Sequence, residues 1–212
     1  KNPILRGKTV VDEITYTTDD FAREACGFID RHQQHPFFLY VPFNAVHNPM
    51  DPPEKYIAPF APMKDEKRRK FAAMLTALDS GVGSILGKLN EHDLTNNTLV
   101  IFISDNGGPT AQTTSNNGPL RGFKTQVLEG GIRVPFMMQW PGHIRPDQTY
   151  SEPVISLDIL PTIVAAAGGA PAVATRTPRR NDARISSGPL AMAMSTVGAA
   201  QSIVMRSWFT SR

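Results

Sequence analysis

An apolar run that stops abruptly at polar residues is the feature that most constrains the fold of this chain. Residues 98–108 read T-L-V-I-F-I-S-D-N-G-G, with an unbroken apolar stretch at 99–103. A short continuous apolar run closed by turn residues predicts a buried strand, of the kind found in parallel sheets. Asp105 and Asn106 follow this strand, at the end where ligands gather in open α/β sheets.

Asp105 and Asn106 place a carboxylate beside a side-chain amide oxygen. Both groups are hard oxygen donors, which suit Ca²⁺ or Mg²⁺ better than a metal that prefers nitrogen ligands. The alternative interpretation is a simple turn, because Asp, Asn and Gly all favour turns. This segment alone leaves both interpretations open.

Helices and strands are predicted to alternate along most of the chain. Helical spacing of apolar residues recurs over 18–30, 67–89 and 157–167, and short apolar runs occur at 36–41, 99–103 and 134–140. This order predicts an α/β domain with a mostly parallel sheet flanked by helices.

Composition separates the end of the chain from the rest. Residues 171–212 hold six arginines, no lysine and a single acidic residue, Asp182. They show no clear period, so we expect a poorly ordered tail after a domain over 1–170. The basic tail does not indicate nucleic-acid binding, because it has little aromatic interleaving. No apolar run is long enough to predict a transmembrane helix.

The single cysteine, Cys26, excludes an internal disulfide framework and leaves the compartment open. The first residues, K-N-P-I-L-R-G-K, lack the apolar core of a signal peptide. The oligomeric state is not indicated by any pattern in the chain.

Two further segments carry side chains that suit an anion site. His47 lies in a proline-rich loop after the 36–41 strand, at the same predicted sheet edge as Asp105. Residues 118–135, G-P-L-R-G-F-K-T-Q-V-L-E-G-G-I-R-V-P, include Lys124 in a loop rich in charge. A histidine, a cation and metal-type oxygens on neighbouring loops suit a tetrahedral oxyanion. The plainer alternatives are a structural histidine and a solvated charged turn.

Taken in order, the motifs resemble those of the sulfatase family, within the alkaline-phosphatase-like superfamily. The matching stretches are P-F-F-L-Y-V-P-F-N-A-V-H-N-P, L-D-S-G-V-G, N-N-T-L-V-I-F-I-S-D-N-G-G, G-P-L-R-G-F-K, E-G-G-I-R-V-P, W-P-G-H-I and S-L-D-I-L-P-T-I. The resemblance covers roughly residues 10–170. Several motifs in the right order are far more specific than any one alone.

The resemblance implies a sulfuric ester hydrolase that acts on a sulfated small molecule or a sulfated sugar. In sulfatases a cysteine converted to formylglycine attacks the sulfate ester, and a divalent cation, usually Ca²⁺, polarises the sulfate. By position, Asp105 and Asn106 correspond to two of the metal ligands. His47 corresponds to the histidine that assists departure of the alcohol, and Lys124 to the lysine that binds the sulfate oxygens.

Two features of the family are absent. No C-x-P-S-R or C-x-A-S-R motif is present, and Cys26 lies in E-A-C-G-F instead. The paired aspartates that open the family domain are also absent, since Asp19 and Asp20 begin a predicted helix. We therefore expect an incomplete domain, the carboxyl half of a sulfatase catalytic domain over 1–170, which is inactive alone because an N-terminal portion is missing.

The tail over 171–212 is unlike the family, and its composition fits either a shifted reading frame or unusual divergence. A periplasmic or extracellular location is compatible with a full-length member of the family.

Two other functions are considered beside the sulfatase hypothesis. Phosphatases and phosphodiesterases of the same superfamily typically use His-rich, two-zinc sites, often with D-H where this chain has Asp105 and Asn106. The carbonyl oxygen of Asn favours Ca²⁺ instead. The other alternative is a non-catalytic relic that keeps the sheet and the anion-binding loop.

Overall fold

A computed structural model of the chain describes residues 3–170 and the backbone of 200–206. Its elements follow in the order β1 (Leu5–Arg6), β2 (Thr9–Val10), α1 (Thr17–His32), β3 (Phe38–Pro42), α2 (Glu54–Ile57), η1 (Ala58–Phe60), α3 (Glu66–Glu91), η2 (Thr95–Asn97), β4 (Thr98–Ser104), α4 (Thr110–Thr113), α5 (Glu129–Ile132), β5 (Phe136–Gln139), η3 (Ser156–Asp158), α6 (Ile159–Ala166) and β6 (Ala200–Arg206). The helices and strands expected from the apolar patterns are all present. The proline-rich loop after β3 contains the short helices α2 and η1.

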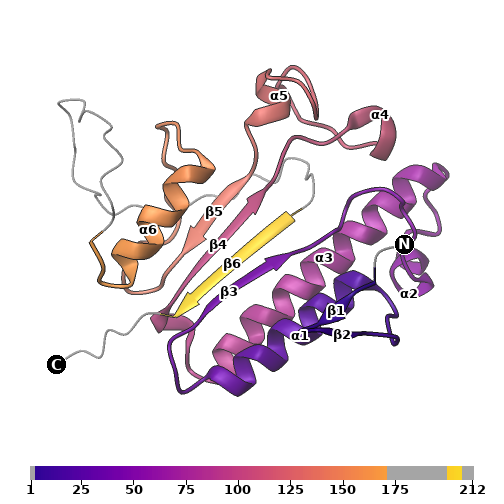
Figure 1. Cartoon of the computed structure of the whole chain (residues 1–212). Coiled ribbons are helices and arrows are strands. Elements are labelled where there is room, and N and C mark those ends of the chain that lie inside the picture. The colour runs from indigo at the N-terminus through magenta and orange to yellow at the C-terminus, as the bar shows by residue number, and fades with distance from the viewer. Residues whose placement is uncertain (1–2, 171–199, 207–212) are drawn as a thin grey trace.

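Three layers make up the described structure: α1 and α3 on one face of a four-stranded sheet, and α6 on the other (Figure 1). The helix side of the core contains Ile29 of α1, Phe71 and Leu78 of α3, and Val41 of β3. Side chains alternate along a strand, so Val100 and Phe102 of β4 face this same core. An α/β fold with helices on both faces is therefore confirmed.

The opposite face of the sheet has a second, smaller core. Leu99 and Ile101 of β4 pack there with Trp140 and with Ile163 of α6. The apolar run at 99–103 is continuous because β4 is covered on both faces. Trp140 also donates from its indole nitrogen to the carbonyl of Asn96, which satisfies the one polar atom of that side chain.

The longest helix, α3, begins where the sequence supplies a cap. Asp65 is the N-cap residue, and its side chain accepts a hydrogen bond at 3.1 Å from the backbone N–H of Arg68. This bond satisfies one of the amide groups that a helix start leaves without a partner. The helix then buries a stripe of apolar residues from Phe71 to Leu89 against the sheet and α1.

Strand directions differ from the mostly parallel sheet that was expected. The strand order is β3-β6-β4-β5, and each neighbouring pair is antiparallel. Strands β3 and β4 run in the same direction, but β6 lies between them. The prediction was wrong on this point because an apolar run shows that a strand is buried on both faces and does not show the direction of its neighbours.

Residues 200–206 also differ from the expectation of a poorly ordered tail, because they form β6 in the centre of the sheet. The same expectation for 171–199 and 207–212 lies outside the described residues.

The carboxyl ends of β3 and β4 lie at the same edge of the sheet. Pro42 at the end of β3 pairs with Gln201, and Ile103 near the end of β4 pairs with the same residue. Because neighbouring strands are separated by about 4.8 Å, the two strand ends lie roughly 10 Å apart. The loops with α4 and α5 lie beyond this end of the sheet (Figure 1).

Candidate active site

The loop that leaves β3 presents His47 at the surface of this sheet edge. Ala45 and Val46 are fully buried below it, and the backbone N–H of His47 donates to the carbonyl of Asn44 at 2.8 Å. The side chain itself is exposed. A buried anchor with an exposed imidazole is the arrangement that a ligand-binding histidine needs.

Lys124 meets His47 from a loop that follows β4. Its ammonium nitrogen lies 3.2 Å from Nε2 of His47, and the two residues are 77 positions apart in the chain. Nδ1 of His47 lies 2.6 Å from the carbonyl oxygen of Asn48. Because a carbonyl oxygen only accepts, this contact assigns the proton to Nδ1 and leaves the lone pair of Nε2 for the lysine. In this tautomer Nε2 of His47 accepts a hydrogen bond from the ammonium of Lys124.

Asp105 and Asn106 form the turn directly after β4, beside the end of β3. Asp105 is exposed, and its Oδ1 accepts from the backbone N–H of Asn106 at 2.8 Å. Burial and then the negative charge of Asp105 raise the pKa of Tyr40, a β3 residue. The turn and the β3 end thus lie within electrostatic reach of one another.

The oxygen donors of this turn fit a hard divalent cation. The side-chain nitrogen of Asn106 donates to the carbonyl of Gly107 at 3.2 Å, which orients the amide and leaves its Oδ1 as a potential ligand. In the described part of the chain, neither Asn106 Oδ1 nor Asp105 Oδ2 accepts a hydrogen bond. One anionic and one neutral oxygen suit Ca²⁺ in kind but supply only part of its six to eight ligands.

The loop after this turn is anchored on the first turns of α3. Arg68 donates to the carbonyl of Thr114 at 2.8 Å, and Lys67 donates to the carbonyl of Ala111 at 3.2 Å. These two basic side chains at the start of α3 hold the 110–114 segment beside the site.

The sequence interpretation missed Asn117, which is 8% exposed and bonds to backbone atoms of both Gly108 and Gly122. It lies immediately before the G-P-L-R-G-F-K motif. An amide side chain flanked by a glycine turn and a glycine loop is the signal that could have found it.

Cys26 does not fit the role of a nucleophile in this site. It lies inside α1, half-buried, and burial raises the pKa of its thiol, with Lys88 lowering it to a smaller extent. Lys88 belongs to the last turn of α3, whereas Lys67 of the first turn contacts the site loops. At 1.5 Å per helical residue these two lysines are roughly 30 Å apart. The one cysteine of the chain therefore lies far from this edge.

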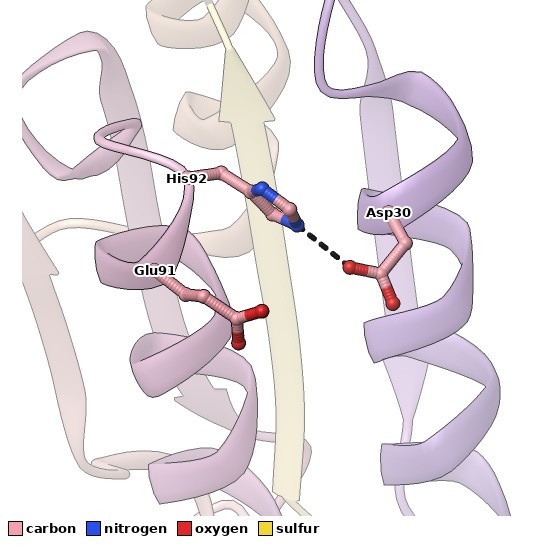
Figure 2. Close-up of side chains that lie close together, drawn as sticks. All are labelled: Asp30, Glu91 and His92. Carbon is pink, nitrogen blue, oxygen red and sulfur yellow. Dashed lines mark hydrogen bonds and ion pairs between the residues drawn. The ribbon is translucent and has the colours of Figure 1, made fainter.

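A second group of ionisable residues lies at that far end of α3. One ligand atom each from Asp30, Glu91 and His92 falls within 4.8 Å of the others, and Figure 2 shows Asp30 of α1 opposite His92. Lys88 Nζ lies 3.2 Å from Asp30 Oδ1 and 2.8 Å from Glu91 Oε2. The ammonium of Lys88 thus already neutralises the carboxylates of Asp30 and Glu91, where a metal cation would bind. The group is an ion-pair network that ties α1 to α3.

Comparison with known proteins assigns the fold and motifs to one family. The sulfatase family model matches residues 5–170. The chain belongs to the sulfatase family. This sulfatase is 36% identical over 154 residues to arylsulfatase H of Canis lupus familiaris, which covers 69% of the chain and 26% of that relative. It is 36% identical over 168 residues to a sulfatase of Formosa agariphila, which covers 72% of the chain and 30% of that relative.

Solved structures agree with the family assignment. The structure of Ps i-CgsB in complex with k-i-k-neocarrahexaose superposes with a TM-score of 0.75 at 39% sequence identity. The match covers 79% of this sulfatase and 38% of that chain. The alkaline-phosphatase-like fold is therefore shown, and the chain spans about a third or less of the curated relatives named above.

Proposed function

We propose that this sulfatase chain is part of a sulfuric ester hydrolase and carries the cation-binding and leaving-group side of its active site. Asp105 and Asn106 supply two oxygen ligands to a divalent cation. Lys124 binds the sulfate oxygens, and His47 assists departure of the alcohol. The roles follow the family motifs that these residues occupy.

The contact between Lys124 and His47 is the observation that carries this proposal. Two loops that leave β4 and β3 bring an ammonium and an imidazole to 3.2 Å at one edge of the sheet. A sulfate monoester presents three non-bridging oxygens and one ester oxygen, so it needs a fixed cation and a proton donor side by side. Preorganised charge at the position of developing oxyanion is the usual source of rate in such reactions.

The histidine is oriented for proton transfer to an ester oxygen. The carbonyl oxygen of Asn48 accepts a hydrogen bond from Nδ1–H of His47. A second ring proton would therefore be bound at Nε2, which faces Lys124. The pair is therefore suited to bind a sulfate and then protonate its leaving oxygen.

A divalent cation, with Ca²⁺ as the proposed ion, would supply charge stabilisation at the sulfate. Asp105 and Asn106 would hold it with a carboxylate oxygen and an amide oxygen. The described residues at this edge include no cysteine nucleophile, because Cys26 lies at the far end of α1 and α3. We propose that the chain alone is inactive for that reason.

The substrate class is a sulfated small molecule, with a sugar sulfate favoured. One similar solved protein, Ps i-CgsB, is in complex with k-i-k-neocarrahexaose. A relative of different specificity is steryl-sulfatase of Rattus norvegicus, 34% identical over 158 residues. The Pro-rich loop after β3 and the 109–119 loop are where such differences would arise, because both lie beside His47 and the Asp105 turn.

A phosphatase or phosphodiesterase of the same superfamily is the second candidate, and a non-catalytic anion-binding relic is the third. Asn106 speaks against a two-zinc site, because a neutral amide oxygen is a poor ligand for a nitrogen-preferring metal. The exposed His47 and the partly exposed Lys124 speak against pure packing roles, since neither residue is buried in the core.

Anion binding by the full 212-residue chain tests the proposal. Inorganic sulfate and inorganic phosphate are each titrated while backbone and side-chain nitrogen signals are followed by NMR. We expect sulfate to shift the signals of Lys124 and His47 first, and Lys124→Met to weaken binding at least tenfold. Lys8→Met is the matched control, since Lys8 is an exposed lysine of the β1–β2 segment. An equal effect of both substitutions, or preference for phosphate, would contradict a sulfatase site.

A further inference from the structure

Two segments of the site are joined by one buried side chain, Asn117. Its Oδ1 accepts from the backbone N–H of Gly108 at 2.9 Å. Its Nδ2 donates to the carbonyl of Gly108 and to the carbonyl of Gly122, each at 3.1 Å. Both amide hydrogens and the amide oxygen are therefore used, and the side chain is 8% exposed at the residue level.

The two segments that Asn117 joins carry the candidate ligands. Gly108 ends the turn of Asp105 and Asn106, and Gly122 lies two residues before Lys124. Asn117 thus connects the cation-binding turn to the lysine loop through a single rigid amide.

Close backbone contact between glycines completes the connection. The N–H of Gly107 donates to the carbonyl of Gly131 at 2.9 Å, and the N–H of Gly130 donates to the carbonyl of Arg121 at 2.8 Å. A Cβ on Gly107 would lie 1.7 Å from the carbonyl oxygen of Gly130, and one on Gly130 would lie 2.2 Å from that of Gly122. Gly130 and Gly131 therefore lie against both segments, at contacts where only backbone fits.

We propose that Asn117 is the positioning residue of this site: it fixes the separation between the Asp105–Asn106 turn and Lys124. The side chain touches neither of the candidate ligand groups and acts through the backbone of Gly108 and Gly122. Its consequence for sulfate binding rests on the proposed function, whereas its effect on the two loops does not.

Asn is the residue type that this position requires. Asp has the same shape and keeps the acceptor for Gly108 N–H, but its carboxylate has no donor for the two carbonyl oxygens. Those carbonyls would then face a negatively charged oxygen in a buried place, which is costly. Gln keeps the amide but displaces it by one methylene, and the glycine contacts leave no room to compensate.

Asn117→Asp in the full chain is the deciding variant, and Asn116→Asp is its matched control. Asn116 is exposed, and its Oδ1 accepts from Gly118 N–H at 2.8 Å, a bond that a carboxylate also makes. Hydrogen-exchange protection is measured by NMR at the amides of Gly107 and Gly130, with α3 amides as the internal reference. We expect protection of the two glycines to fall at least tenfold in Asn117→Asp and to stay unchanged in Asn116→Asp and in α3.

A pH series separates positioning from simple loss of packing. When the introduced carboxyl is protonated, it regains one donor, so protection relative to the natural chain at the same pH should recover as the pH falls toward about 4. Sulfate titration of the same variant at pH 7 should show binding at Lys124 weakened about tenfold. If the amides of Gly107 and Gly130 are as protected from hydrogen exchange in Asn117→Asp as in the natural chain, the proposal is overturned.

The sulfate titration tests the proposed function, and the hydrogen-exchange data test the positioning role of Asn117. If the natural chain shows no sulfate shift at Lys124, the sulfate role fails, and the exchange data alone decide whether Asn117 positions the loops. If Asn117→Asp loses protection throughout α3, the chain has unfolded, and Asn117→Gln is measured in its place. Reduced protection confined to Gly107 and Gly130 then supports the proposal, and unchanged protection overturns it.

Discussion

Lys124 Nζ lies 3.2 Å from Nε2 of His47, across 77 positions of sequence. The contact exists because β3 and β4 end at the same edge of the sheet, where Pro42 and Ile103 pair with one residue of β6. A pair assembled from two loops in this way has no stabilising role in the core, since His47 is exposed. The proposed binding role of the two residues rests on this contact.

The chain alone is predicted not to hydrolyse an aryl sulfate. Oxyanion-stabilising groups without a nucleophile leave only residual catalysis, and the one cysteine of the chain lies inside α1. Release of 4-nitrophenol from 4-nitrophenyl sulfate is measured with purified protein and compared with a His47→Ala control. Turnover of the natural chain above that control would show that a nucleophile has been overlooked.

Calcium is predicted to bind the chain only weakly, with a Kd no tighter than about millimolar. Asp105 and Asn106 offer two oxygens, far fewer than Ca²⁺ needs, and other ligands would have to come from water. Calorimetric titration with Ca²⁺ measures the affinity, and Asp105→Ala should remove the site. Asp12→Ala is the control, because Asp12 is an exposed carboxylate away from the turn. A micromolar site abolished by Asp105→Ala would contradict the two-ligand assignment.

Removal of the α3 cap is predicted to destabilise the domain by about 0.5–2 kcal/mol. Asp65→Ala deletes the acceptor that bonds Arg68 N–H at 3.1 Å and leaves that amide to water. Urea unfolding followed by circular dichroism gives the change in free energy. The same measurement on Asp12→Ala should differ from the natural chain by much less. Equal stability of Asp65→Ala and the natural chain would mean that the cap bond has no net value.

Stability is predicted to depend on pH through Asp30. Its hydrogen bond from His92, and then those from Lys88, hold the pKa of the Asp30 carboxyl below its ordinary value of 3.8. A depressed folded-state pKa adds stability at pH values above the unfolded pKa, and that stability is lost as the pH falls through the folded pKa. Asp30→Asn should therefore lower the urea midpoint at pH 6, and the difference should shrink as the pH falls below 3.8 and through the lower folded-state pKa of Asp30.

His92→Gln provides the second arm of the pH experiment. It removes the main cause of the depressed pKa, so the pH dependence attributable to Asp30 should shrink in this variant. A difference between Asp30→Asn and the natural chain that persists unchanged at low pH would show that the effect of the substitution is not electrostatic.

Local sequence was sufficient for most of the helices and strands. The stripe from Phe71 to Leu89 predicted α3, and the run at 99–103 predicted β4, because burial of one face or of both faces leaves a periodic pattern in the chain. The motifs likewise indicated the family, which the comparisons confirmed, and they indicated the site residues, whose roles stay a proposal. Asn117 was missed, because an amide before a glycine-rich loop signals a residue that bonds to backbone without showing which backbone groups it bonds to.

The sequence by itself determined which segments are helices and strands, which family the chain belongs to, and which residue types end its strands. Only the tertiary structure decided that β6 lies between β3 and β4, that every neighbouring pair is antiparallel, and that Lys124 meets His47. The physical reason is range: hydrophobic periodicity and turn preferences act over a few residues, whereas strand order and loop contacts depend on how distant segments pack. Asn117 combines the local and the long-range contribution. The sequence shows its amide group, and the fold determines which backbone groups that amide bonds to.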